Sequence, residues 1–274
     1  MHPLLDPIIL LLCADDEAQV QQGLALLEAL QDDELLRQVS AGLVIDSSQL
    51  RLGDGPLRGS LKNRHRERVL LSLARLSGCL EQVTHLSFGE HSRLLDLSAL
   101  AALSGLKQLS ELSFLVCESL ESLEGMPEVP RLQTLTAQGC RSLKNLGDVA
   151  TCASLEHLSI QYCNRLESLA PLADCGNLLT LSLQGCNRID DLQPLAGMQQ
   201  LRELDLRGCG ALTDVSSLSE LPQLRVLDLS YCSQLRDFSV LPPLPALEVL
   251  YLSGNYIGRR ERSVRFPRLN TVLL

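Results

Sequence analysis

Apolar residues recur along most of this chain at fixed spacings, and the repeat is clearest over residues 178–200. This stretch reads L-x-x-L-x-L-x-x-C-x-x-I-x-x-L-x-x-L-x-x-M, and the pattern returns about every 23 residues. A fixed period of this length is typical of chains that stack one structural unit per repeat. No single repeat can bury its own apolar residues, so neighbouring repeats must share one continuous core.

Each repeat predicts a short strand followed by an arc. The strand is the L-x-L phrase, such as Leu181 and Leu183, where apolar and polar residues alternate and one face is buried. Three apolar residues then follow at steps of three, which suits an extended or 3₁₀-like path. We expect parallel strands to begin near residues 83, 109, 132, 155, 178, 201, 224, 247 and 269.

A cysteine marks the bend after the strand in most repeats. The spacing between these cysteines is 23 residues, and His91 marks an irregular first copy. We call the following set the cysteine ladder: Cys117, Cys140, Cys163, Cys186, Cys209, Cys232 and Asn255. A thiol is small and a weak hydrogen-bond donor, so it suits a bend that is nearly dry.

The pattern over residues 83–274 resembles that of leucine-rich repeat proteins. The C-x-x-L spacing is similar to cysteine-containing repeats of plant nucleotide-binding immune receptors. The P-L-A phrase at Pro171 and Pro194 resembles bacterial internalin-type repeats. The resemblance implies an α/β solenoid, a horseshoe or arc with a parallel sheet on its concave side. It implies about eight full repeats and a terminal strand.

Residues 1–82 lack the repeat and predict a helical domain that caps the first coil, since a solenoid end exposes apolar core and a free strand edge. Residues 8–13 predict a first helix, with a signal peptide as the alternative. Asp15 or Asp16 can cap a second helix. We expect further helices over residues 33–41 and 60–76, a strand over 43–46 and a loop over 47–59.

Charge is distributed unevenly along the chain. Residues 83–258 hold 20 acidic and 11 basic side chains, which argues against wrapping nucleic acid. The basic stretch 62–68 predicts a solvated face, with a patch for nucleic acid or an acidic partner as the alternative. Residues 259–268 hold five arginines. Because no C-terminal cap domain is visible, either this segment covers the last coil or a second chain does, as in a homodimer.

The ten cysteines favour a reducing compartment. Six of them occupy one repeat position, where thiols stacked one coil apart would be at risk in an oxidising environment. We therefore expect a cytoplasmic protein with reduced thiols. The spacing of 23 residues supplies no chelating pair, so zinc is the less favoured alternative.

No catalytic motif stands out in the sequence, and no cofactor is expected. The one pairing with nucleophile chemistry is His157 with Cys163. His157 should face outward from its strand while Cys163 turns into the bend, so the two should not meet. The sequence therefore predicts a protein that is not an enzyme.

The outward positions of the strands are the best candidates for a binding surface. From residue 201 onward they become charged and aromatic, which the fold does not require. Earlier in the array Gln138, Gln161 and Gln184 can form a hydrogen-bonded ladder. The predicted partner-binding residues are Asp205, Arg207, Asp228, Tyr231 and Tyr251.

These observations favour a non-catalytic module that binds a protein partner on the concave face, with neither nucleic acid nor membrane as partner. Two alternatives share the fold. One is an inhibitor or immunity-type regulator of an enzyme, and the other is a secreted bacterial effector.

Overall fold

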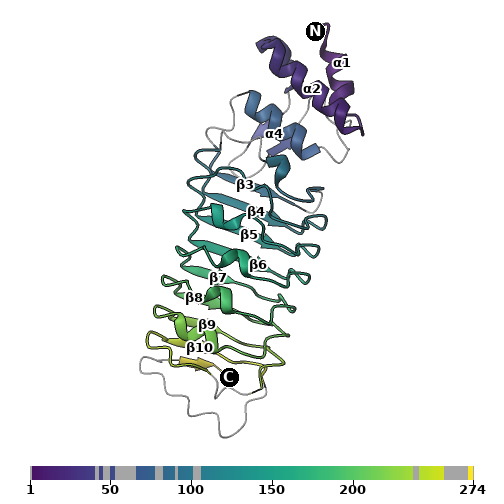
Figure 1. The fold of residues 1–274 in the computed structure, drawn as a ribbon. Coiled ribbons are helices and arrows are strands. Elements are labelled where there is room, and N and C mark those ends of the chain that lie inside the picture. The colour runs from purple at the N-terminus through teal and green to yellow at the C-terminus, as the bar shows by residue number, and fades with distance from the viewer. Residues whose placement is uncertain are drawn as a thin grey trace.

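The computed structural model shows a long solenoid with helices at its N-terminal end (Figure 1). It describes residues 2–40, 43–45, 50–52, 66–77, 83–89, 92–100, 106–236, 241–255 and 271–273. Five features expected from the sequence lie wholly or partly outside the described part: His91, residues 47–49 and 53–59 of the expected loop, the start of the helix at residue 60, the side chains of the basic stretch 62–68 and the arginines of residues 259–268.

Nine parallel strands form one sheet in the described residues, in the order in which they occur along the chain. They are β3 (His85–Phe88), β4 (Glu111–Leu115), β5 (Thr134–Gln138), β6 (His157–Gln161), β7 (Thr180–Ser182), β8 (Glu203–Asp205), β9 (Val226–Asp228), β10 (Val249–Tyr251) and β11 (Thr271–Leu273). Figure 1 shows them stacked as successive rungs along one side of the solenoid. The predicted parallel sheet is confirmed.

Each strand begins two residues after the apolar residue that the repeat pattern marks. In β7, for example, the N–H of Leu178 donates to the carbonyl of Cys175 at 3.3 Å, so Leu178 closes a turn before the strand starts at Thr180. This leading leucine is still fully buried.

Strand register follows the repeat: Leu181 pairs with Leu204, and Ser182 pairs with Asp205. Both leucines are 1% exposed, and a slip of one residue would turn every strand leucine toward solvent. Behind the sheet, the apolar steps of three form the expected 3₁₀ turns. These are η2 (Ser98–Leu100), η3 (Val149–Thr151), η4 (Ala170–Leu172), η5 (Gln193–Leu195) and η6 (Ser216–Glu220).

The described residues of the N-terminal region form four helices: α1 (Leu5–Leu12), α2 (Glu17–Leu30), α3 (Asp33–Val39) and α4 (Arg66–Leu76). Asp16 caps α2 by accepting the N–H of Ala18 at 3.4 Å. None of the described helices is long and apolar enough to cross a membrane.

The prediction of a loop over residues 47–59 is wrong for residues 50–52. Leu50–Leu52 form the strand β2, which pairs antiparallel with β1 (Leu43–Ile45). The phrase Leu50-Arg51-Leu52 alternates apolar and polar residues as a strand does, a signal that the nearby glycines and proline obscured.

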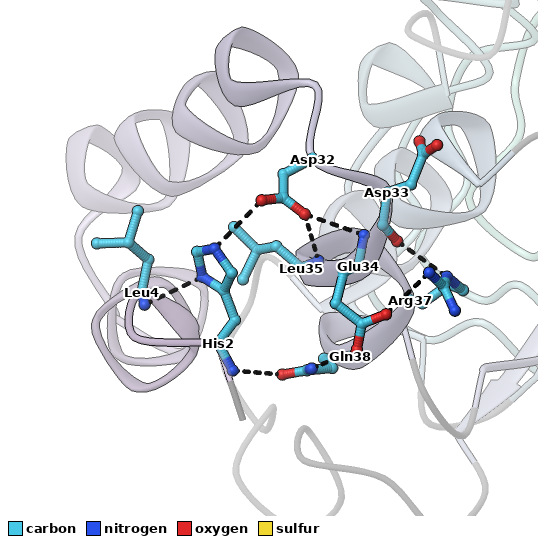
Figure 2. Close-up of polar contacts among 8 residues, drawn as sticks. All are labelled: His2, Leu4, Asp32, Asp33, Glu34, Leu35, Arg37 and Gln38. Carbon is cyan, nitrogen blue, oxygen red and sulfur yellow. Dashed lines mark hydrogen bonds and ion pairs between the residues drawn. The ribbon is translucent and has the colours of Figure 1, made fainter.

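Polar contacts join His2 to α3 (Figure 2). The His2 N–H donates to Gln38 Oε1 at 2.8 Å, and His2 Nε2 lies 3.2 Å from Asp32 Oδ2. Asp32 also caps α3 by accepting the N–H groups of Glu34 and Leu35. The N–H of Leu35 is the main cause that lowers the pKa of the Asp32 carboxyl.

Two hydrophobic clusters meet at α4. Val69, Leu70 and Leu73 pack with buried residues of α1, α2 and α3. Leu71 and Ala74 instead join the long cluster that continues through the solenoid as far as Leu252. Helix α4 therefore packs against both the N-terminal helices and the first coils of the solenoid.

Candidate functional site

Outward side chains of neighbouring strands stand in rows on the solvent face of the sheet. Asp205 on β8 pairs in register with Asp228 on β9, and Asp228 pairs with Tyr251 on β10. The structure therefore brings together three of the five residues predicted to bind a partner. The alignment follows from the fixed period, because residues at one repeat position occupy one row.

The solvent face is hollowed over β5 to β10. The hollow has a volume of about 450 Å³. Its lining residues are Thr134, His157, Leu158, Ser159, Gln161, Thr180, Leu181, Ser182, Glu203, Leu204, Asp205, Val226, Asp228 and Tyr251. Neither Arg207 nor Tyr231 lines it, so the predicted patch is divided into two parts.

A chain of hydrogen bonds crosses the sheet and ends at Asp205. Gln138 Nε2 donates to Gln161 Oε1 at 3.4 Å, and Gln161 Nε2 donates to Ser182 Oγ at 3.2 Å. Ser182 Oγ then donates to Asp205 Oδ2 at 3.0 Å. The expected glutamine ladder is correct for its first two members only, because the amide of Gln161 turns to Ser182 rather than to Gln184.

Asp205 and Asp228 each stabilise the turn that follows their strand. Asp205 Oδ1 accepts the N–H of Arg207 at 2.9 Å, and Asp228 Oδ1 accepts the N–H of Ser230 at 2.7 Å. Their second oxygens differ. Asp205 Oδ2 is taken by Ser182, whereas Asp228 Oδ2 has no hydrogen-bond partner among the described residues.

Arg207 and Tyr231 form a separate pair beyond the strand ends. β8 ends at Asp205, so Arg207 lies beyond the strand and not at one of its outward positions as expected. The Arg207 guanidinium carbon lies 5.3 Å from the centre of the Tyr231 ring, within range of a cation–π interaction. Tyr231 is 52% exposed.

Residues just before the cysteine ladder share a left-handed backbone conformation. Four are glycines, and the others are Val116, Tyr162 and Tyr231, with φ angles of 57°, 55° and 59°. Each of the two tyrosine rings lies over the glycine of the next repeat. An added Cβ at Gly185 would come within 2.6 Å of Tyr162, and one at Gly254 within 2.4 Å of Tyr231.

Members of the cysteine ladder bond the backbone of the preceding coil. Cys186 Sγ donates to the Ile160 carbonyl at 3.2 Å, and Asn255 Nδ2 donates to the Leu229 carbonyl at 2.8 Å. The six ladder thiols are fully buried. Burial is the main cause that raises the pKa of Cys186 to about 11 and that of Cys232 to about 12.

His157 and Cys163 lie on opposite sides of the sheet. His157 lines the hollow, where its Nδ1 is 2.9 Å from Thr180 Oγ1, whereas Cys163 is fully buried. No group of three His, Cys, Asp or Glu residues is placed to hold a metal ion in the described part of the chain. The side chains that line the hollow can donate and accept hydrogen bonds, and the carboxylates among them can bind cations.

Sequence reasoning missed Glu203, which stands two residues before Asp205 on β8 and lines the hollow. Glu203 pairs in register with Thr180 on one side and Val226 on the other. The period of two along a strand was a sufficient signal for this row, because positions 203 and 205 share one face.

Comparisons with known proteins agree with this architecture. Residues 153–197 and 199–243 match the family model of leucine-rich repeats in two copies. A search of curated proteins finds no sequence match.

Two solved structures with TM-scores above 0.5 are similar in fold, and a third gives a weaker match. The leucine-rich repeat domain of the type III effector XopL is 18% identical, with all of this chain and 96% of that chain covered and a TM-score of 0.52. The mouse RP105/MD-1 complex is 22% identical with a TM-score of 0.51, covering 73% of this chain but only 35% of that one. Internalin C2 from Listeria monocytogenes is 17% identical, with coverage of 88% and 92% and a TM-score of 0.48.

Residues 153–197 and 199–243 therefore match leucine-rich repeats, and the stacked parallel strands show that the rest of the described solenoid shares their fold.

Proposed function

We propose that this protein binds another protein across the hollow of its sheet and catalyses no reaction itself. The observation that carries the proposal is the hollow, which gathers side chains from six neighbouring strands on one rigid surface. The leucines of these strands form the core, whereas the intervening outward side chains face solvent and are available to a partner.

The side chains around the hollow are of types that contribute strongly to protein interfaces. Tyr251 lines it, and Tyr231 and Arg207 lie in the region that follows the strands. Tyrosine and arginine are enriched among residues that dominate binding energy. Because the strands already fix the backbone, binding here orders few additional groups.

We further propose that the protein works in a reducing compartment such as the cytoplasm. All nine cysteines in the described residues are free thiols, and eight of them are buried. Stacked thiols of this kind are compatible with a reducing environment.

The proposal is tested by measuring affinity for a partner captured with the intact protein and then purified. We expect Tyr231→Ala, Tyr251→Ala and Arg207→Ala each to weaken binding by about 1–3 kcal/mol. Ser113→Ala is the matched control, since Ser113 occupies an outward position on β4 outside the hollow. Unchanged affinity in all three variants would contradict the proposal.

A further inference from the structure

We propose that the hollow recognises an extended, basic segment of a partner protein, with one lysine or arginine side chain held between Glu203 and Asp228. This inference rests on the proposed function and adds the chemistry of the partner. It is carried by the charge of the hollow, by its open acceptors and by the apolar surface between them.

The hollow is acidic without an internal counter-charge. Glu203, Asp205 and Asp228 line it, and its described lining contains no lysine or arginine. Arg207 follows Asp205 closely in sequence, but its guanidinium lies against the Tyr231 ring. A cationic group is therefore the complement that this face lacks.

Two carboxylates in the hollow have acceptor atoms to offer. The structure gives no hydrogen bond or ion pair to the Glu203 carboxylate or to Asp228 Oδ2 among the described residues. Asp205 is different, because the Arg207 N–H and Ser182 Oγ occupy both of its oxygens. The open acceptor atoms therefore belong to Glu203 and Asp228, and Asp205 offers none.

Glu203 and Asp228 stand diagonally on neighbouring strands. One strand spacing and two residues of rise separate their backbones by about 8 Å. A lysine ammonium or an arginine guanidinium entering between their side chains can bond to both carboxylates. Arginine, with five donors in a planar fork, fits two acceptors especially well.

An apolar surface adjoins these acceptors. Val226 pairs in register with Glu203, and Tyr251 pairs with Asp228. Both are partly exposed and both line the hollow. The alkyl stem of a lysine or arginine side chain can cover such a surface while its charged end reaches the carboxylates.

The dimensions favour a protein segment over a free ion. The hollow extends over six strands, and five spacings of about 4.8 Å give a length of about 24 Å, which an extended segment of about seven residues would span. The described residues offer no group of three ligands for a metal ion.

The test uses the full-length protein and a library of seven-residue peptides with every position varied. We expect retained peptides to be enriched in lysine or arginine. For a purified binder, Glu203→Gln and Asp228→Asn should each weaken binding by about three- to tenfold, as should replacement of the peptide's cation with norleucine. Affinity should fall as sodium chloride is raised.

Two controls separate charge from folding. In the Asp228→Asn variant the side-chain carbonyl can still accept the Ser230 N–H, so the turn should persist, and thermal unfolding would verify it. Asp190→Asn removes an equal charge from an exposed position on the arc and should change affinity less than twofold.

Retained peptides without enrichment of basic residues, or equal affinity in Glu203→Gln, Asp228→Asn and wild type, would overturn the inference. One result would overturn this inference and still support the proposed function. If Tyr251→Ala weakens the captured partner while both carboxylate variants bind it normally, the hollow binds a protein but not through a cation.

Discussion

Most strands in the described array are followed by a left-handed residue and then a member of the cysteine ladder. Glycine fills the left-handed position in four repeats, but Val116, Tyr162 and Tyr231 accept a conformation that ordinarily disfavours side chains. Tyr162 and Tyr231 lie over glycines of the following repeat, Gly185 and Gly254, whereas Gly208 follows another glycine, Gly185, along this edge.

This difference in neighbours predicts different costs for two glycine substitutions with nearly the same φ angle. Gly208→Ala (φ +73°) meets nothing closer than 3.7 Å and should destabilise the fold by about 1–2 kcal/mol through strain alone. Gly185→Ala (φ +72°) must also displace the Tyr162 ring, at a further cost of about 1 kcal/mol. Urea unfolding measures both.

The matched test of this explanation is the double variant Tyr162→Ala with Gly185→Ala. With the ring absent, the added cost of the alanine at position 185 should fall to the value found at position 208. An equal cost in the presence and absence of the ring would show that Tyr162 does not constrain this glycine.

Two thiols of the cysteine ladder, Cys186 and Cys232, predict a loss of stability in alkali. The ordinary thiol pKa of 9.0 is raised by burial to about 11 at Cys186 and about 12 at Cys232. Unfolded chains therefore release these protons first as the pH rises. The stability contributed by the protonated buried thiols is complete below pH 9 and is lost as the pH rises through about 11–12.

Urea unfolding at intervals from pH 8 to pH 11 measures this dependence. Ellman titration at pH 8 supplies the control, with few reactive thiols in the native protein and ten after denaturation. Constant stability across this range, or a high native thiol count, would show that the ladder is not buried as thiols.

Among the elements, α4 joins the N-terminal helices to the solenoid, since its residues belong to both hydrophobic clusters. The expected cap over residues 1–82 remains a prediction, but this helix gives it a specific form. Leu71 is fully buried in the solenoid cluster, although it belongs to a helix outside the repeats.

Leu71→Ala should therefore destabilise the fold by about 2–5 kcal/mol, as expected for a buried leucine. Leu10 in α1 is 76% exposed, and Leu10→Ala should change stability by no more than about 0.5 kcal/mol. The midpoint of thermal or urea unfolding would compare the two. A small effect of Leu71→Ala would mean that α4 is not integral to the first coils.

The strands and 3₁₀ turns could be predicted closely because one period repeats through the sequence. A repeat whose own pattern is ambiguous is therefore assigned by its neighbours. Every expected strand is present, with an offset of two residues that turn closure at the leading apolar residue explains. The hairpin of β1 and β2 has no repeat to support it, and there the sequence reading failed over Leu50–Leu52.

Across the whole molecule, the candidate site was only partly predictable. The rows through Asp205, Asp228 and Tyr251 follow from the period, and so does their alignment. The position of the Arg207 side chain, the hydrogen-bond chain from Gln138 and the role of Ser182 depend on side-chain rotamers and strand ends, which no periodicity encodes.

The central claim, that a protein partner occupies the hollow, is tested most directly by site-specific photo-crosslinking. A benzoylphenylalanine would replace Tyr251 in the hollow or, as the control, exposed Asp190 on the arc, each in the full-length protein. Illumination with the purified partner should yield a covalent complex from residue 251 and little from residue 190. Efficient crosslinking at 190 with none at 251 would place the partner elsewhere and contradict the claim.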